Sequence, residues 1–244
     1  MKRIVIVGAT SGIGLATARR CIASGWRIGA AGRRTEALEK LRSLAPERVA
    51  VEPIDVTDPA APAALERLIE KTGGMDIYLH VAGIGSQNPQ LDPGVELRTV
   101  ETNVDGFTRM VTAAYGYFAR NGGGRIAAVS SIAGTKGLGS AASYSASKRF
   151  QNTYIDALAQ LARMERLDIR FTDIRPGFVD TDLLKDGHRY PMLLAPERAA
   201  AHIVRALERG SRRTVIDRRY ALLVFFWRLI PQALWERLTV RTRS

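Results

Sequence analysis

The chain has 244 residues, 46% of them hydrophobic, and a formal net charge of +12. This apolar content is enough for a sizeable core and excludes extensive disorder. The single cysteine, Cys21, excludes an internal disulfide, and it suits a core position in a protein of a reducing, cytoplasmic compartment. The basic excess does not predict a nucleic-acid partner, because no zinc-finger spacing, helix-turn-helix phrase or aromatic-basic RNA motif accompanies it, and we expect no metal site.

The first predicted element is a strand at residues 4–7, an unbroken β-branched run typical of a parallel strand that is buried on both faces. A glycine-punctuated turn follows, and then apolar residues recur at the spacing of a helix. This order places free backbone N–H groups at the positive end of a helix dipole, where glycine lets a phosphate approach. Such turns also occur for purely steric reasons. Our interpretation is a dinucleotide pyrophosphate site formed by Gly8, Thr10, Ser11, Gly12, Ile13 and Gly14.

Beyond this turn, strands and helices alternate at short spacing. Further strands are predicted at residues 26–31, 49–54, 76–82, 125–129, 168–174 and 214–216. Helices are predicted at residues 96–120, 142–166 and 196–209. Two further helices are predicted from their N-caps. One begins after Thr35 and carries Leu38, Leu41 and Leu44 on one face, and the other begins after Asp58, with Pro59 at the first helical position. The alternation predicts an α/β domain over residues 1–217, with a Rossmann-type doubly wound parallel sheet of about seven strands.

The residues that could carry chemistry all follow the ends of predicted strands. In an open parallel sheet, ligands bind outside the carboxyl ends of the strands. The residues at these ends are the glycine turn from Gly8 to Gly14, Arg33, Asp55, Ala82, Gly83, Ser130, Ser131, Pro176 and Gly177. Their convergence at one edge of the sheet is the strongest functional signal in the sequence.

Tyr144 and Lys148 lie four residues apart in a predicted helix, so they share one face of it. A free tyrosine has a pKa of about 10, and a nearby ammonium lowers that pKa by favouring the phenolate. Tyr144 is therefore a candidate general acid or base, and the Ser131 hydroxyl is a candidate donor to a substrate carbonyl oxygen. The alternative is an ordinary polar helix surface, with Ser131 as a strand-end turn residue.

Together these motifs resemble the short-chain dehydrogenase/reductase family, in its shorter-chain branch. The family phrase Thr-Gly-x-x-x-Gly-x-Gly matches Gly8, Gly12 and Gly14, with Val7 in place of the usual threonine. The resemblance implies hydride transfer between a nicotinamide cofactor and a carbonyl or alcohol. It places the catalytic tetrad on Asn103, Ser131, Tyr144 and Lys148.

The same resemblance implies a role for each site residue. Tyr144 would exchange the proton with the substrate oxygen, which Ser131 positions. Lys148 would hold the nicotinamide ribose and lower the pKa of Tyr144, and Asn103 would support a water that connects the lysine to solvent. The other implied cofactor contacts are Asp55 and Val56 at the adenine, Ala82 and Gly83 after the fourth strand, and Pro176, Gly177, Val179 and Thr181 at the nicotinamide carboxamide.

The family's Asn-Asn-Ala-Gly phrase is half lost here, because residues 80–83 read His-Val-Ala-Gly. We interpret His80 as a strand residue whose ring is hydrogen-bonded by a neighbour, and not as a catalyst.

The choice of cofactor depends on the end of the second strand, where an acid would bind the adenosine ribose and an arginine would bind a 2′-phosphate. Arg33 and Arg34 stand there, so we expect NADP; the alternative is that both arginines are merely solvated.

Residues 183–194 form a loop where the family places a substrate lid, and their apolar content favours a lipophilic ketone or aldehyde. Residues 218–244 form an apolar and basic helical extension, which Arg228 and Pro231 interrupt too early for a membrane span. We expect this extension to lie peripherally on a membrane, to form a homodimer contact, or to cover the substrate cleft. A second interpretation of the chain is a non-catalytic NADP-binding regulatory or membrane-surface scaffold protein, which would not need the intact tetrad.

Overall fold

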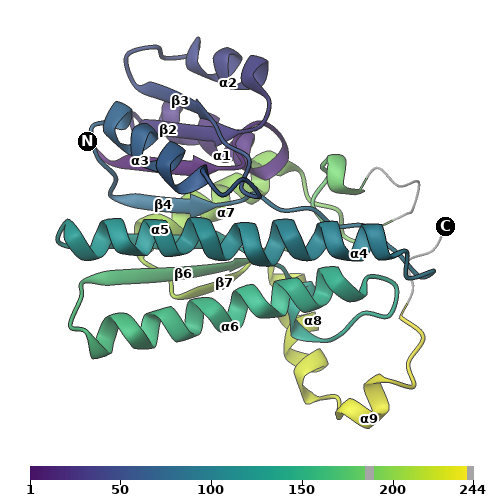
Figure 1. Cartoon of the computed structure of the whole chain (residues 1–244). Coiled ribbons are helices and arrows are strands. Elements are labelled where there is room, and N and C mark those ends of the chain that lie inside the picture. Colours follow the sequence, from purple (N-terminus) through teal and green to yellow (C-terminus); the bar gives the residue numbers. More distant parts are fainter. Residues whose placement is uncertain (185–189, 241–244) are drawn as a thin grey trace.

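The computed structural model describes residues 1–184 and 190–240. Within these residues, seven parallel strands form one central sheet (Figure 1). The strands are β1 (Arg3–Val7), β2 (Arg27–Gly32), β3 (Val49–Pro53), β4 (Ile77–His80), β5 (Gly124–Val129), β6 (Ile169–Arg175) and β7 (Arg213–Val215). Their order across the sheet is β3-β2-β1-β4-β5-β6-β7. The chain builds the sheet outward from β1 to β3 on one side and from β4 to β7 on the other, which confirms the predicted Rossmann-type doubly wound sheet.

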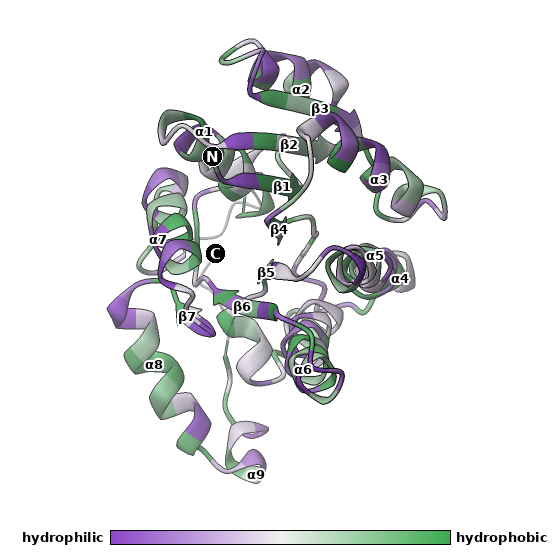
Figure 2. Cartoon of the chain, turned by 90° about the vertical axis from the view of Figure 1, so that its left-hand side faces the viewer, coloured by the Kyte–Doolittle hydropathy of each residue, from purple (hydrophilic) through white to green (hydrophobic). Residues whose placement is uncertain are grey.

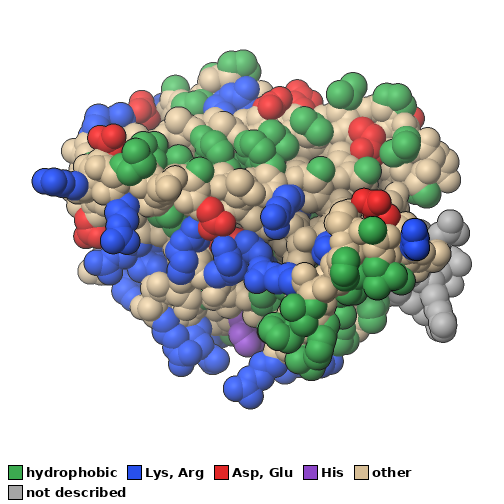
Figure 3. All heavy atoms as spheres, turned by 90° about the horizontal axis from the view of Figure 1, so that it is seen from below, with side chains coloured by type: hydrophobic (Ala, Val, Ile, Leu, Met, Phe, Trp, Pro, Cys, Tyr) green, Lys and Arg blue, Asp and Glu red, His purple; other side chains and the backbone are tan. Residues whose placement is uncertain are grey.

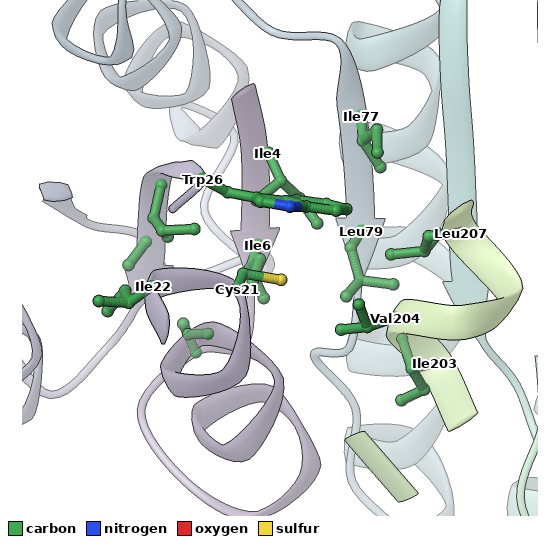
Figure 4. Packing of buried hydrophobic residues seen from close by; sticks show 14 of the residues in the cluster. Ile4, Ile6, Cys21, Ile22, Trp26, Ile77, Leu79, Ile203, Val204 and Leu207 are labelled. Atoms are coloured by element: carbon green, nitrogen blue, oxygen red, sulfur yellow. The ribbon is translucent and has the colours of Figure 1, made fainter. Parts of the chain in front are cut away.

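Helices cover both faces of the sheet (Figure 2). One face carries α1 (Gly12–Ala23), α2 (Thr35–Arg42) and α7 (Pro196–Arg209), and the other carries α3 (Ala61–Thr72), α5 (Phe107–Arg120) and α6 (Ala142–Met164). This arrangement explains the unbroken apolar run of β1. Ile4 and Ile6 pack with Cys21 of α1 in one core (Figure 4), while Val5 and Val7 pack in the other.

The helix predicted at residues 96–120 starts earlier and is interrupted. It consists of α4 (Pro93–Val100), a π-helical turn η1 (Glu101–Gly106) and α5. Asp92 caps α4, because its carboxylate accepts the Val95 N–H at 2.9 Å, and a proline follows it at the first helical position. Turns of the π type often occur at functional sites, and η1 contains Asn103.

The helix after β2 differs from the prediction at both ends. Arg34 is the N-cap of α2 and Thr35 is its first residue, so the predicted threonine cap is wrong. The helix ends at Arg42, whereas the predicted apolar face continues to Leu44. Leu44 is 55% exposed, because the chain beyond the last turn no longer follows the helical period that buries Leu41.

The start of α3 also lies later than predicted. The Asp58 carboxylate accepts the Ala60 N–H at 2.7 Å and closes a tight turn before the helix instead of capping it. Consequently α3 begins at Ala61, and the proline in its first turn is Pro62, not Pro59. Asp58 and Pro59 therefore mark the tight turn before α3 and not the first turn of the helix.

The C-terminal extension folds onto the 3-10 turn that follows β5. The elements concerned are α8 (Arg218–Leu229), α9 (Gln232–Trp235) and the turn η2 (Ile132–Thr135). Tyr220 and Val224 of α8 are buried, and Trp235 of α9 donates its indole N–H to the Gly137 carbonyl at 2.7 Å. No helix in the described part of the chain has the length and apolar character needed to cross a bilayer.

Candidate functional site

The glycine turn between β1 and α1 is packed too tightly for side chains. A Cβ at Gly8, where φ is +96°, would lie 2.5 Å from the Ala82 nitrogen, and a Cβ at Gly14 would strike the Gly8 carbonyl oxygen. Ser11 is the N-cap of α1 but makes no side-chain hydrogen bond to the helix. Ser11 therefore leaves the first N–H groups of α1 uncapped, and this turn fits a bound phosphate.

Two arginines stand beside this turn at the end of β2. The Arg34 guanidinium donates to Thr10 Oγ1 at 3.2 and 3.3 Å. Arg33 Nη1 lies 3.9 Å from the Asp55 carboxylate, and the Arg33 side chain is 72% exposed. Burial alone would raise the pKa of Asp55, but hydrogen bonds from Thr57 and the charge of Arg33 leave that pKa lowered. The two guanidinium groups thus lie at the edge where an adenosine 2′-phosphate would be expected.

The segment after β6 approaches the glycine turn from the other side. A Cβ at Gly12 would lie 2.9 Å from Thr181 Cγ2, and both residues line a surface hollow that extends to Pro196 of α7. Val179 is buried and pairs with Leu194 in an isolated parallel bridge. The turn η3 (Asp182–Leu184) follows, and residues 185–189 of the expected lid lie outside the described part of the chain.

Ala82 and Gly83 connect the glycine turn to the tetrad. The Ala82 N–H donates to the Val7 carbonyl at 2.9 Å. A Cβ at Gly83 would lie 3.0 Å from Asn103 Oδ1 and 3.4 Å from Lys148 Nζ. Glycine at this position therefore lets the chain after β4 pass directly beside the asparagine and the lysine.

The remaining expected cofactor residues are more enclosed. Val56 is 5% exposed and packs against η1. The Pro176 carbonyl accepts the Ile132 N–H at 3.0 Å. A Cβ at Gly177 would strike the Tyr220 ring, so this segment is held between η2 and α8.

Ser131, Tyr144 and Lys148 meet at the end of β5. Ser131 hydrogen-bonds the Tyr144 hydroxyl, and its Oγ also accepts the Ala133 N–H at 3.1 Å. Lys148 Nζ lies 5.8 Å from the centre of the Tyr144 ring. A Cβ at Gly85 would strike that ring, so glycine is required on the other side of the tyrosine. The structure therefore brings three of the four tetrad side chains around one phenol.

Burial dominates the protonation of these groups. It raises the pKa of Tyr144, and the hydrogen bond with Ser131 only partly opposes the shift. Burial lowers the pKa of Lys148 to about 8, against the opposing charge of Asp173. Burial, which disfavours the phenolate, therefore sets the direction of the Tyr144 pKa shift in this structure, opposite to the lowering expected from Lys148.

Asn103 holds the backbone after β4. Its Oδ1 accepts the Ile84 N–H at 2.9 Å, and its Nδ2 donates to the Ile84 carbonyl at 2.7 Å and to Ser147 Oγ at 3.1 Å. Its own carbonyl accepts Gln151 Nε2 at 2.9 Å. Asn103 thus fixes the segment that passes beside Lys148.

Two residues of this site were not identified from the sequence. Gln151 is 1% exposed and lies three residues after Lys148, whose Nζ donates to Gln151 Oε1 at 3.1 Å. A signal existed for it, because residues i and i+3 share a helix face. No local pattern marks Gly85, since its role arises only where the distant Tyr144 ring packs against it.

His80 is buried at the end of β4. Its Nδ1 lies 2.9 Å from the Tyr78 hydroxyl, and its ring packs edge-on against Phe107. Burial and the charge of Lys148 lower its pKa to about 3, so the ring is neutral at pH 7. Among the described residues, its Nε2 has no hydrogen-bond partner. This is the environment of a core histidine with one satisfied nitrogen.

Sequence comparison places the chain among known oxidoreductases. Residues 2–189 match the family model described as short chain dehydrogenase. The chain is 31% identical over 251 residues to an uncharacterized oxidoreductase of Myxococcus xanthus, with 98% of this chain and 96% of the relative covered. It is 32% identical over 266 residues to dehydrogenase/reductase SDR family member 7B of Bos taurus, with 99% of this chain and 81% of the relative covered.

Solved structures share the fold. A short-chain dehydrogenase from Streptomyces avermitilis has a TM-score of 0.80 and 24% identity, with 92% of each chain covered. ElxO with NADP bound has a TM-score of 0.79 and 19% identity, with 91% of this chain and 99% of ElxO covered. At these identities the likeness concerns the arrangement of the sheet and its helices.

Proposed function

The chain belongs to the short-chain dehydrogenase family of hydride-transferring oxidoreductases, and on that premise we propose that it is an NADP-dependent enzyme acting on a lipophilic ketone, aldehyde or alcohol. The observation that carries the proposal is the meeting of Ser131, Tyr144 and Lys148 at the end of β5. These groups lie on the same edge of the sheet as the glycine turn, where the carboxyl ends of the strands converge.

When bound, the cofactor supplies or accepts the hydride. The chain's own residues bind and orient the reactants. The open N–H groups of α1 bind the pyrophosphate, Lys148 holds the nicotinamide ribose, and Val179 and Thr181 hold the carboxamide. Ser131 and Tyr144 both donate hydrogen bonds to the substrate oxygen, which fixes the reacting carbon relative to the nicotinamide.

Tyr144 performs the proton transfer. Its pKa is raised by burial, so its hydroxyl keeps the proton at neutral pH. In the reductive direction it gives that proton to the oxygen that develops negative charge. The ammonium of Lys148, 5.8 Å from the ring centre, then stabilises the phenolate that remains. This electrostatic arrangement favours reduction of a carbonyl.

NADP is proposed over NAD because of charge at the end of β2. The Arg33 guanidinium is mostly exposed, and its contact with Asp55 is long. Arg34 lies on Thr10 of the glycine turn. Two guanidinium groups suit a phosphate dianion, whereas a ribose hydroxyl pair would need an acceptor such as a carboxylate at the strand end.

A lipophilic substrate is proposed because apolar side chains pack beside Ser131, and Phe178, Tyr190 and Met192 among them are only partly buried. Ile132 belongs to a buried apolar cluster with Tyr220, and Phe178 and Met192 pack against this cluster. Phe178 also lies 4.7 Å, between ring centres, from Tyr190 of the expected lid. Such surfaces bind hydrocarbon and exclude water from the reacting oxygen.

The remaining proposals concern the whole molecule. We propose a cytoplasmic homodimer in which residues 1–217 form the catalytic domain and residues 218–244 meet a membrane peripherally. The competing function is a regulatory or scaffold protein that binds NADP without turnover. The hydrogen bond between Ser131 and Tyr144 favours the enzyme, because cofactor binding alone would not require it.

NADPH oxidation against aldehydes and ketones of increasing chain length tests the enzyme directly. Turnover should rise with chain length, and Tyr144→Phe should keep NADPH affinity while losing nearly all turnover, because the substitution removes only the hydroxyl group that carries the acidic proton. Full turnover in Tyr144→Phe would contradict the mechanism. Cofactor binding without turnover on any member of the panel would support the scaffold protein instead.

A further inference from the structure

Helix α8 has two apolar stripes, and the fold covers only one of them. Tyr220 and Val224 face the domain and are 1% and 3% exposed, with Leu223 and Trp227 half-buried beside them. The second stripe follows the same helical spacing and is 55–65% exposed; it consists of Leu222, Phe225, Phe226 and Leu229. A helix that only packs against η2 needs one apolar stripe, because the opposite face of a surface helix is normally polar.

The exposed stripe continues into the residues after α8. Leu234, Leu238 and Val240 are 51%, 46% and 37% exposed. We call these three residues and the exposed stripe of α8 the tail patch. From the α9 side, hydrophobic side chains gather at one end of the molecule beside a band of Lys and Arg (Figure 3). Contiguous apolar patches on soluble proteins mark binding surfaces.

The tail patch is held in place by specific contacts. Lys136 Nζ donates to the Ile230 carbonyl at 2.8 Å, and the Trp235 indole donates to the Gly137 carbonyl at 2.7 Å. The Trp227 and Trp235 rings pack edge-on, with centres 5.4 Å apart. The patch is therefore presented by a fixed helix pair, so little ordering entropy is lost when it binds.

The charges around the tail patch are almost all positive. Residues 218–240 contain four arginines and one acid, Glu236, which accepts a hydrogen bond from Gln232. Arg219 pairs with Asp217. Within the described part of the chain, Arg218, Arg228 and Arg237 form no ion pair. Their charge is available to an anionic partner.

A second copy of the chain is a poor partner for this surface. A two-fold contact sets the same patch against itself, which would bring the unpaired arginines of both copies together in a protein that already carries +12. Like charges across an interface oppose association. An anionic bilayer instead offers hydrocarbon to the apolar side chains and phosphates to the arginines.

We propose that the tail patch docks on an anionic lipid bilayer, with Phe225, Phe226 and Leu229 at the acyl boundary and the arginines at the lipid phosphates. This inference deepens the peripheral membrane contact of the proposed function. The Tyr220 hydroxyl on the inner side of α8 donates to the Pro191 carbonyl at 2.7 Å, and its ring covers Gly177. Docking thus places the apolar cluster of Ile132, Tyr220 and Phe178 next to the membrane, the proposed source of a lipophilic substrate.

Vesicle sedimentation of the full chain tests the docking. The protein should partition onto vesicles of phosphatidylcholine with 30% phosphatidylglycerol and bind pure phosphatidylcholine at least tenfold less. The triple variant Phe225→Ser/Phe226→Ser/Leu229→Ser should partition onto the anionic vesicles at least tenfold less than the wild type. The variant Arg218→Gln/Arg228→Gln/Arg237→Gln should lose at least tenfold on the anionic vesicles and should not change the weak binding to pure phosphatidylcholine. A matched control, Leu97→Ser/Met164→Ser, removes exposed apolar side chains elsewhere and should bind like the wild type.

Two outcomes would overturn the docking proposal. Equal partition of the serine triple variant and the wild type would show that the tail patch does not bind lipid. A dimer that sediments in the ultracentrifuge and dissociates in the triple variant, without vesicle binding, would assign the patch to a second copy. NADPH titration of every variant separates this test from the proposed enzyme, because none of the substituted residues is among those proposed to hold the cofactor.

A second inference comes from the buried contacts behind Lys148. Lys148 Nζ donates to Gln151 Oε1 at 3.1 Å and to the Val129 carbonyl at 3.2 Å, and Gln151 Nε2 donates to the Asn103 carbonyl at 2.9 Å. Lys148, Gln151 and Asn103 are 4%, 1% and 0% exposed. One amide therefore joins the lysine to the π-helical turn η1.

This amide stabilises the charged lysine. Oε1 accepts one N–H of the ammonium, the Val129 carbonyl accepts another, and the third remains for a ligand. Other groups also act on the lysine: the Asp173 carboxylate on β6 favours its charge, and neutral His80 and Tyr144 pack near it without a compensating charge. Loss of the Gln151 acceptor would leave a buried ammonium less well solvated.

We propose that Gln151 is a positioning residue that holds the Lys148 ammonium toward the cofactor ribose and joins it to Asn103, in the place where the family resemblance implies a water. This inference rests on the proposed function. Residues three apart share a face of α6, which places the Gln151 amide directly beside the Lys148 ammonium. Gln151 touches neither cofactor nor substrate, and it acts through the lysine.

NADPH affinity as a function of pH tests this role without a known substrate. Wild-type affinity should fall as Lys148 loses its proton, near its pKa of about 8. Gln151→Leu should move that fall to lower pH by about one unit, because the charged form loses an acceptor, and Gln151→Glu should move it to higher pH. Thr153→Ala, an exposed change on the same helix, should leave the profile unchanged.

An unchanged pH profile in both Gln151 variants, with reduced stability only, would show a purely structural role and overturn the inference. If Gln151→Leu does not fold, Gln151→Glu alone still decides, because its shift has the opposite sign. Failure of the proposed enzyme would appear separately, as the absence of turnover on the carbonyl panel while the affinity profile of the wild type remains measurable.

Discussion

The first helix and the last long helix of the chain have the same length, 12 residues, and opposite relations to the fold. The apolar side chains of α1 lie on one face, and the sheet buries Ala18, Cys21 and Ile22 completely or nearly so. We propose that α1 binds the cofactor phosphate through the backbone N–H groups at its first turn. In α8 the fold uses one apolar stripe and leaves Phe225 and Leu229 exposed. A surplus of apolar side chains, beyond what packing consumes, therefore distinguishes a surface for a partner from an element of the core.

Gly14→Ala tests whether the backbone N–H groups of α1 bind the cofactor phosphate, and it should have the largest effect. Gly14→Ala would place a methyl group against the Gly8 carbonyl oxygen and displace the N–H groups from the phosphate. NADPH affinity should fall by about 100-fold, equivalent to about 2.7 kcal/mol, in a fluorescence titration. Gly139→Ala, where a Cβ meets open space, is the control and should bind normally. Normal binding by Gly14→Ala would show that the phosphate lies elsewhere.

Acid should lower the free energy of unfolding through His80, at the end of the central strand β4. Its pKa is about 3 in the folded chain and higher when unfolded, so its contribution is complete above the unfolded pKa and is lost as pH falls below it. Between pH 7 and pH 5 the free energy of unfolding should drop by about 2 kcal/mol from this residue.

His80→Gln should reduce that loss while keeping an acceptor for the Tyr78 hydroxyl. Urea denaturation at the two pH values measures the difference. If the wild type and the variant lose equal stability, the acid sensitivity belongs to other groups.

The arginines beside α1 should determine cofactor choice. Arg33→Ser should weaken NADPH binding about tenfold, or about 1.4 kcal/mol, and leave NADH binding unchanged, because only the 2′-phosphate contact is removed. Arg27→Ser, at the opposite end of the same strand, should change neither. Equal losses for NADPH and NADH would assign Arg33 to the shared part of the cofactor, and tighter wild-type binding of NADH would contradict the NADP preference.

The smallest expected effect is a difference in the free energy of unfolding between variants of the buried and the exposed stripe of α8. Val224→Ala removes buried methyl groups and should lower the free energy of unfolding by about 1 kcal/mol. Leu222→Ala, on the exposed stripe, should change it by less than about 0.5 kcal/mol. Thermal unfolding of the two variants makes the measurement. A large loss in Leu222→Ala would mean that the exposed stripe is covered in the folded protein.

The strands and most helices could be predicted from the sequence because their signals are local. Runs such as residues 4–7 and the alternation of strands with helices reflect burial on both faces of a parallel sheet. Errors occurred where two local signals compete. Asp58 can cap a helix or close a turn, and only the path of the chain before α3 decides between them.

The candidate site was predictable as a set of residues and not as a set of contacts. Strand ends place Ser131 and the glycine turn on one edge of the sheet whatever the side chains do. The raised pKa of Tyr144, the bridge from Lys148 through Gln151 to Asn103, and the fit of Gly85 against the phenol depend on depth of burial and on atoms far apart in the chain.

The α/β fold, the glycine turn, the family and the residue types available for catalysis could be predicted before any contact was known, because they follow from periodicity and from short motifs. The tertiary structure decided which face of α8 is covered, which partners hold Asn103 and Lys148, and how burial shifts their protonation. The physical reason is that spacing along the chain specifies backbone geometry, whereas desolvation and hydrogen bonding depend on which surfaces the packed helices bring together.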